Sequence, residues 1–462
     1  MRTALSFLLI LILSIRVCSQ TEASKSGKIE AYMKQAHQLG VFNGNALVME
    51  NDLTVYRGSW GYSDADKKIP LTEKSIFRIG SIAKEFNAVG IMMLKEQGKL
   101  RLDQTVNEFF PDLPSWSKKI KIIHLLQYTS GLPDVNWYTI KSEEDNWKDL
   151  YALNQLKFEP GSDYFYNNNN TFLQRKIIEK ITGMKFNDFV QQQILTPCGV
   201  THAIIDPIGT EPFVTQSFDD NFKQDSVVLH VTGWTCVNID DLYKWSQALT
   251  NFKNINPVST LEILTPVAPG RQAGLGGGTM KNNRIERHVH DGTSQSSQAL
   301  MVTDASKKRT VLFLTNQRHD NLREMNEDIT NILENKPYSQ PRKSILKEYA
   351  KQLNSMNAEE FMSFYKSLKD KYPSLYGFDN ANTLNEIGYY FLYDKKSPVD
   401  AIAIFELNVT LFPKSGYVVD SLAEGYLKNG DKKKALHYYK ESIALGYNEN
   451  HDAKKIIEDL EK

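Results

Sequence analysis

The sequence predicts an α+β domain over residues 26–335, followed by an all-α helical-repeat domain over residues 346–462. Three observations lead to this prediction. Strand-like runs alternate with amphipathic helices in the first part, a linker at residues 336–345 contains two prolines, and the part beyond it is helical almost throughout. With 462 residues, of which 41% are hydrophobic, the chain is long enough for two domains with separate cores.

Two strand pairs are expected in the first domain. The runs "NALVMEND" and "LTVYRGSWGY" predict a hairpin with Asn51 and Asp52 in its turn, and "QALMVTD" and "RTVLFLTN" predict a second hairpin. An apolar helix is expected over residues 82–97, ended by Gly98. The segment "NLREMNEDITNILEN" has the spacing of an amphipathic helix. This mixture of elements is what predicts the α+β class.

The second domain repeats at a shift of 34 residues, which places Ala401 on Ala435 and Phe405 on Tyr439. A helix–turn–helix period of this length, with small and aromatic residues at fixed places, resembles tetratricopeptide repeats. Such a unit either binds a protein partner in a groove, docks on the first domain, or only stabilises the fold. The sequence leaves these interpretations open.

The first 19 residues have the pattern of a signal peptide, with Arg2 ahead of a short apolar run at residues 4–15. This pattern predicts export to the periplasm or the medium, and the alternative is an uncleaved N-terminal anchor. No later stretch is apolar enough to span a membrane. A formal net charge of zero without a basic tract argues against nucleic acid as a partner.

Only Cys198 and Cys236 would remain after cleavage, and we expect two separate buried thiols rather than a disulfide. Neither the cysteine spacing nor a histidine cluster indicates a metal site. No cofactor is therefore expected.

"FRIGSIAKEF" places Ser81 and Lys84 three residues apart, so both side chains lie on one face of a helix. Other pairs share this spacing, among them Ser115 and Lys118 in a polar loop. Ser81 differs because Gly80 allows a tight turn before it and a long apolar helix follows. A helix N-terminus also favours the negative charge that develops on a serine nucleophile.

Two further short motifs complete the candidate site. Tyr166 and Asn168 form a Tyr-x-Asn motif in "FYNNNN", and His290 and Gly292 form a His-x-Gly motif in "VHDGTS". Each motif is expected about once by chance, so an ordinary polar loop and an ordinary strand histidine are the alternatives. A serine nucleophile needs a base and an oxyanion hole, which these residues are able to supply.

The order of the three motifs, at residues 81, 166 and 290, resembles serine β-lactamases and penicillin-binding proteins. The stretches "FRIGSIAKEFNAVGIMMLKEQGKLRLDQTV", "HLLQYTSGL", "FYNNNNTFLQRKIIEKITG" and "DLYKWSQAL" resemble class C β-lactamase-like serine hydrolases. The resemblance covers about residues 26–335. It implies an antiparallel sheet flanked by helices, with a helical subdomain and the active site between them.

The resemblance also implies roles for individual residues. Ser81 would be the acylated nucleophile, and Lys84 would accept its proton directly or together with Tyr166, which would return a proton to the leaving group. Asn168 would hold Lys84 and a substrate amide. The backbone N–H groups of Ser81 and Thr293 would form the oxyanion hole, next to the motif glycine Gly292.

His290 stands where most β-lactamases have a lysine. A neutral imidazole holds a substrate carboxylate less firmly than an ammonium group, which favours a peptidase or esterase over an efficient β-lactamase. The sequence thus predicts an exported serine hydrolase for small D-amino-acid peptides, peptidoglycan fragments or esters. The alternative is a hydrolase-like binding protein that has lost turnover and works through its repeats.

Overall fold

The computed structural model describes residues 25–461, apart from residues 220, 227–229, 269, 319–320 and 448–450. The predicted signal peptide at residues 1–19 lies outside the described residues. The chain divides into a larger compact unit that reaches Tyr338 and a smaller one from Ser339 onward, with which residues 38–41 and 268–270 are grouped. Among the described helices, none is long and apolar enough to cross a membrane.

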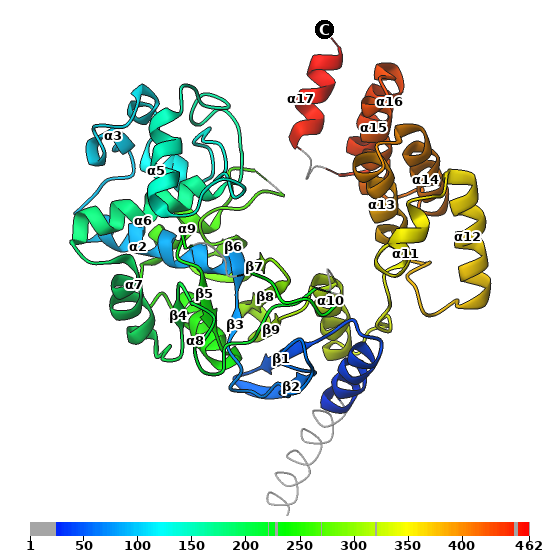
Figure 1. Ribbon diagram of the computed structural model, residues 1–462, viewed down its shortest axis with the longest axis horizontal. Helices are drawn as coiled ribbons and strands as arrows, with labels where there is room; N and C mark the ends of the chain where they lie inside the picture. Colours follow the sequence, from blue (N-terminus) through cyan, green and yellow to red (C-terminus); the bar gives the residue numbers. More distant parts are fainter. Residues whose placement is uncertain are drawn as a thin grey trace, which may run out of the picture. The chain divides into compact units, whose positions relative to one another are not determined.

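The larger unit contains a six-stranded antiparallel sheet with the strand order β2-β1-β9-β8-β7-β6 (Figure 1). Its strands are β1 (Gly44–Glu50), β2 (Leu53–Trp60), β6 (Gly277–Lys281), β7 (Arg284–Ser294), β8 (Ser297–Asp304) and β9 (Arg309–Thr315). Strands β1 and β2 form the first predicted hairpin, and β8 and β9 form the second. The β1–β2 turn uses Asn51 and Asp52 at φ angles of 54° and 63°, a backbone region that Asn and Asp tolerate.

The central strands β8 and β9 are buried along nearly their whole length. A strand that is buried on both faces requires cover on both sides of the sheet. Helices α8 (Ile239–Thr250) and α10 (Leu322–Leu333) pack against these strands. The sheet therefore forms an inner layer, and the predicted α+β class is confirmed.

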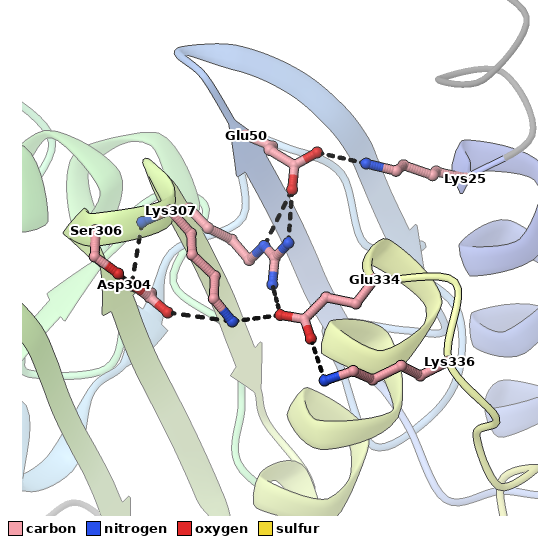
Figure 2. A network of polar contacts seen from close by, with 8 residues as sticks. Lys25, Glu50, Asp304, Ser306, Lys307, Glu334 and Lys336 are labelled. Atoms are coloured by element: carbon pink, nitrogen blue, oxygen red, sulfur yellow. Dashed lines mark hydrogen bonds and ion pairs between the residues drawn. The ribbon is translucent and has the colours of Figure 1, made fainter.

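A network of ion pairs ties the end of α10 to the sheet (Figure 2). Arg309 at the start of β9 pairs with Glu50 of β1 at 2.7 Å and with Glu334, directly after α10, at 3.1 Å. Lys307 and Lys336 also bind the Glu334 carboxylate. Hydrogen bonds from Lys307, Lys336 and Arg309 lower the pKa of Glu334 to about 2.

Helix α2 (Lys84–Glu96) is buried around most of its circumference and forms the centre of the helical part of this unit. Helix α6 (Asn168–Thr182) packs against it at Gly90, where a Cβ atom would come within 2.8 Å of Ile178. Only glycine allows so close an approach of the two helices. The remaining elements of the unit include α3 (Val106–Phe109), α4 (Ile122–Leu126), α5 (Glu143–Ala152), α7 (Phe186–Phe189), α9 (Pro257–Leu264) and a small sheet β3-β5-β4 of Phe77–Arg78, Thr235–Val237 and Ile204–Ile205.

The smaller unit is helical, as expected. Its helices are α11 (Ile345–Leu353), α12 (Ala358–Lys371), α13 (Ala381–Tyr389), α14 (Pro398–Leu411), α15 (Gly416–Lys428), α16 (Lys432–Ala444) and α17 (His451–Leu460). The positions that the sequence aligns at a shift of 34 residues, Ala401 with Ala435 and Phe405 with Tyr439, are all buried in one core. The tetratricopeptide assignment, the domain boundaries and a protein partner for this unit stay predictions.

Candidate active site

Ser81 lies in a 3₁₀ turn, Gly80–Ala83, that runs directly into α2 at Lys84. The sequence predicted an α-helix from residue 82, so the regular helix begins two residues later than expected. A 3₁₀ turn has three residues per turn and therefore aligns residues i and i+3 even better than an α-helix does. The Lys84 Nζ atom accordingly donates a hydrogen bond to Ser81 Oγ at 3.0 Å.

Tyr166 joins this pair from a different part of the chain, just ahead of α6. Its hydroxyl donates to Ser81 Oγ at 2.8 Å, and its ring packs against the buried ring of Tyr128 with centroids 4.5 Å apart. The Lys84 Nζ atom lies 5.1 Å from the centroid of the Tyr166 ring and 5.2 Å from that of Trp234. The structure thus brings both candidate bases within hydrogen-bonding distance of the oxygen of the predicted nucleophile.

The 3₁₀ turn and strand β7 approach each other closely through two glycines. A Cβ atom on Gly292 would lie 2.0 Å from the Ile79 carbonyl oxygen and 2.6 Å from Ser81 N. A Cβ atom on Gly80, which has φ +52°, would lie 2.5 Å from Thr293 N. Because neither position has room for a side chain, the Ser81 and Thr293 backbones face each other, as an oxyanion hole built from these two N–H groups requires.

Asn168 begins α6, and its backbone N and side-chain Nδ2 both donate to Asp134 Oδ1, at 2.6 and 3.1 Å. The expected contact with Lys84 would use the Asn168 Oδ1 atom, because a lysine only donates, and this hydrogen bond is not formed. The Asn168 Oδ1 atom is buried and has no hydrogen-bond partner in the described structure. It is therefore an acceptor that the folded chain leaves unused.

His290 belongs to a second, deeper cluster that the sequence did not predict. Its Nδ1 atom lies 2.7 Å from Oε1 of Glu85, and Nε2 of His288 lies 3.0 Å from the same oxygen. Trp245 donates its indole N–H to the other Glu85 oxygen at 2.6 Å. The side chains of Glu85 and both histidines are at most 2% exposed, so the carboxylate is neutralised within the protein.

Electrostatics keep this carboxylate ionised. Burial would raise the pKa of Glu85, but the charge and hydrogen bonds of His288 and His290 lower it to about 2. Burial likewise opposes a charged His288, yet the charge and hydrogen bond of Glu85 raise the pKa of His288 above its ordinary value. An ionised carboxylate only accepts hydrogen bonds, so His290 donates from Nδ1 and keeps Nε2 for other partners.

The ligand atoms of Glu85, His288 and His290 also lie within 4.8 Å of one another, as in a possible metal site. Tetrahedral zinc ligands with bonds of about 2.0–2.1 Å hold their donor atoms about 3.3 Å apart. The pair formed by His290 and Glu85 is closer, at 2.7 Å, and His288 Nε2 also contacts the carbonyl oxygen of Leu275 at 2.9 Å. A carbonyl only accepts, so this nitrogen carries a proton. The cluster is a hydrogen-bonded network.

Sequence reasoning missed Glu85 and His288, although two signals were present. A glutamate inside an otherwise apolar helix requires a partner, and "HVH" places two histidines on one face of a strand. It also missed Trp234 and Asp134, which lie in loops and have no motif of their own.

The two cysteines are free and buried, as predicted. Burial raises the pKa of the Cys236 thiol to about 12, so this group is no rival nucleophile.

Comparison with known proteins supports one family. A profile of the Beta-lactamase family matches residues 26–334, which are the greater part of the chain. The chain belongs to the Beta-lactamase family. Within it, the chain is similar to serine hydrolases of the β-lactamase and penicillin-binding-protein type.

One relative of the chain is Penicillin-binding protein 4* of Bacillus subtilis (strain 168). It is 27% identical over 341 residues, which are 65% of this chain and 74% of the relative. A solved class C β-lactamase covers 68% of this chain and 98% of its own at a TM-score of 0.58 and 18% identity. D-amino acid amidase from Ochrobactrum anthropi SV3 covers 65% of this chain and 98% of its own, at a TM-score of 0.54 and 19% identity. At these identities the two structures show the shared fold.

Proposed function

We propose that the chain hydrolyses a small amide, peptide or ester through an acyl-enzyme on Ser81. The observation that carries this proposal is the pair of hydrogen bonds at Ser81 Oγ, from Lys84 Nζ at 3.0 Å and from the Tyr166 hydroxyl at 2.8 Å. A nucleophile in contact with two groups able to exchange its proton is the arrangement that acyl transfer needs.

The proposed reaction has two halves. Ser81 Oγ attacks the carbonyl carbon while its proton passes to Lys84 or Tyr166, and the carbonyl oxygen becomes an oxyanion at the N–H groups of Ser81 and Thr293. Tyr166 then gives a proton to the leaving group, whose bond to the carbonyl carbon breaks. Water attacks the resulting ester in the second half while its proton passes to Lys84 or Tyr166. The bond from the carbonyl carbon to Ser81 Oγ then breaks, Oγ takes this proton back, and the acid leaves. Asn168 Oδ1 and His290 Nε2 orient the substrate in this scheme.

The substrates that we favour are D-amino-acid amides and peptides, peptidoglycan fragments and small esters. The fold shared with D-amino acid amidase supports the first class. The imidazole of His290 in place of an ammonium group supports amides and esters over substrates that need a firmly held carboxylate. Turnover of penicillins, D-Ala-D-Ala peptides and short-chain esters, measured side by side, ranks these classes.

A fluorescent fluorophosphonate tests the nucleophile, because it forms a stable bond only with an activated serine. The wild type should be labelled and Ser81→Ala should not. Ser115→Ala is the matched control, since Ser115 also stands three residues before a lysine, Lys118, and lies in a short turn. The control should be labelled like the wild type. Equal labelling of Ser81→Ala would refute the proposal and would favour the alternative of a binding protein without turnover.

Export to the periplasm or the medium belongs to the same proposal and is supported by the apolar run at residues 4–15. N-terminal sequencing of the protein recovered outside the cytoplasm should show cleavage near Ser19. Recovery of the intact N-terminus from the cytoplasm alone would contradict export.

A further inference from the structure

A cavity of about 430 Å³ lies between helix α10 and the face of the sheet that β7, β8 and β9 form. This volume is within the range of small-molecule sites, about 300–1,000 Å³. The lining includes neither Ser81 nor any other residue of the three sequence motifs. The proposed reaction therefore leaves this cavity without a role.

The two walls of the cavity differ in polarity. On the sheet, Val289 pairs with Val302 and Val302 with Val311 across neighbouring strands, so the floor is an apolar row. The α10 residues of the lining are all polar and share one helix face: Arg323, Asn326, Glu327, Thr330, Asn331 and Glu334. Because polar side chains do not pack closely on valines, a space remains between the helix and the floor.

Most charged groups of the lining already have partners. At one end of the cavity, the Glu334 carboxylate binds three cations (Figure 2), which are those of Lys307, Arg309 and Lys336. The other paired groups of the lining are Asp304, with Lys307, and Arg323, with Asp291. These groups are neutralised within the protein and have little charge left for a ligand.

Two charged side chains of the lining, Arg287 and Glu327, have no partner among the described residues. Arg287 lies on β7 and Glu327 on α10, so opposite charges stand on opposite walls of the cavity. They form no ion pair with each other, although both line the same space. A molecule with a carboxylate at one end and an ammonium group at the other is able to bridge them, because a guanidinium holds a carboxylate with two parallel hydrogen bonds.

An amide without a partner lies next to Glu327 in the chain. The side chain of Asn326 makes no hydrogen bond with any described residue, and its Oδ1 atom is buried. A buried polar atom without a partner is costly, so a ligand that supplies a partner is favoured. An ammonium group donates three hydrogen bonds, which is enough for the Glu327 carboxylate and for this amide oxygen.

We propose that this cavity binds a zwitterion with an apolar side chain, either a free amino acid or a short peptide whose two ends are both free. Arg287 holds the carboxylate, Glu327 and Asn326 hold the ammonium group, and the valine row of the sheet accepts the apolar side chain. The site is separate from Ser81, so this inference goes beyond the proposed function and does not depend on turnover.

Matched probes separate the two charges: leucine, N-acetylleucine, which lacks the ammonium group, and leucinamide, which lacks the carboxylate. Calorimetric titration of the Ser81→Ala protein at pH 7 avoids turnover. Leucine should bind about two- to fivefold more tightly than either derivative, the effect of one exposed charge pair. Leucyl-leucine with its own N-acetyl and amide derivatives forms a second series. The series with the stronger preference for the free ends identifies the ligand as the amino acid or the peptide.

Two variants in the same background assign the preference to this cavity. Arg287→Gln should abolish the preference over the amide derivative alone, and Glu327→Gln the preference over the N-acetyl derivative alone. Arg284→Gln, on the same strand but outside the lining, is the control and should change neither. Equal binding of the free and the N-acetylated probe in both series would mean an anion site and would refute the zwitterion. Survival of both preferences in both variants would place the ligand elsewhere and overturn the inference. Neither result depends on hydrolysis, so the proposed function is judged separately.

Discussion

Lys84 and Glu85 are neighbours in the sequence, yet their side chains belong to two different polar clusters. Lys84 donates to the Ser81 hydroxyl, to which the Tyr166 hydroxyl also donates, and Ser81 and Tyr166 are only partly buried. Glu85 reaches His288 and His290 in a cluster whose side chains are at most 2% exposed. Successive residues of a helix point about 100° apart, so one helical turn supplies both clusters.

The two clusters differ in what their protons must do. In the Ser81 cluster a proton has to move during each half of the proposed reaction, and the hydroxyl groups are able to exchange roles as donor and acceptor. In the Glu85 cluster both carboxylate oxygens have donors, and the charges are fixed by burial. Substitutions in the first cluster should therefore change rate before stability, and those in the second should change stability first.

Lys84→Arg should have the largest effect. Arginine keeps the positive charge but does not release a proton at any usable pH, so a base at this position is lost. We expect the single-turnover rate of Ser81 acylation to fall about 100- to 10,000-fold while the protein stays folded. Lys118→Arg, in the other Ser-x-x-Lys pair, is the control and should acylate normally. If Lys84→Arg acylates within about threefold of the wild type, Lys84 is only an electrostatic partner.

Gly292→Ala should have the second largest effect on the rate. A Cβ atom there would lie 2.6 Å from Ser81 N and would push apart the proposed oxyanion donors. Loss of such a donor costs about 100- to 1000-fold in kcat. Gly277→Ala is the matched control in the adjacent strand, since a Cβ atom at that position meets nothing within 4 Å. Steady-state kinetics on a small ester measure both. Similar kcat values for the two variants would show that Thr293 and Ser81 are not the donors.

The sequence predicted the Ser81 cluster more completely than the Glu85 cluster, for a physical reason. The spacing of Ser81 and Lys84 is local, and the hairpins follow from alternating patterns over a few residues. The contact between Glu85 and His290 joins residues 205 positions apart, and only the packing of β7 on the 3₁₀ turn brings them together. No periodicity in the chain encodes such a pairing.

The cavity between the loop at residues 133–138 and helix α5 was not predictable for a related reason. Its wall depends on the conformation of this loop and on the hydrogen bonds that join Asn169 to Pro133 and Asn146. Loop conformation leaves little trace in a single sequence beyond turn residues. The sequence also placed Asn168 against Lys84, whereas Asp134 from this same loop holds the Asn168 amide.

Glu85→Gln tests the buried cluster and should lower the stability of the protein. Glutamine keeps the shape but removes the negative charge beside His288, and breaking a buried pair costs about 3–5 kcal/mol. We expect the low end of this range because the amide oxygen still accepts. For a domain of this size, a loss of about 3 kcal/mol lowers the melting temperature by roughly 6–12 °C. Glu73→Gln, a carboxylate with a side chain 60% exposed, is the control and should melt like the wild type. Equal melting of all three proteins would contradict the structural role of Glu85.

The pH dependence of stability should show the smallest effect. The pKa of Glu85 falls from an ordinary 4.5 to about 2, so its contribution is complete above pH 4.5 and is lost as the pH falls towards 2. The pKa of His288 is raised above its ordinary 6.5, so its contribution is complete below pH 6.5 and is lost as the pH rises through the raised value. Both contributions are complete only between about pH 4.5 and 6.5.

The difference in melting temperature between wild type and Glu85→Gln should therefore be greatest in that window and shrink on either side. Scans by circular dichroism from pH 3 to 9 measure it. The scans also separate this cluster from the exposed ion pairs, because added salt screens surface charges but hardly affects a buried pair. The window should persist at 0.5 M NaCl. A difference that is the same at every pH would mean that Glu85 stabilises the fold through its shape and hydrogen bonds alone, and the contrast with the proton-exchanging Ser81 cluster would then rest on packing rather than on charge.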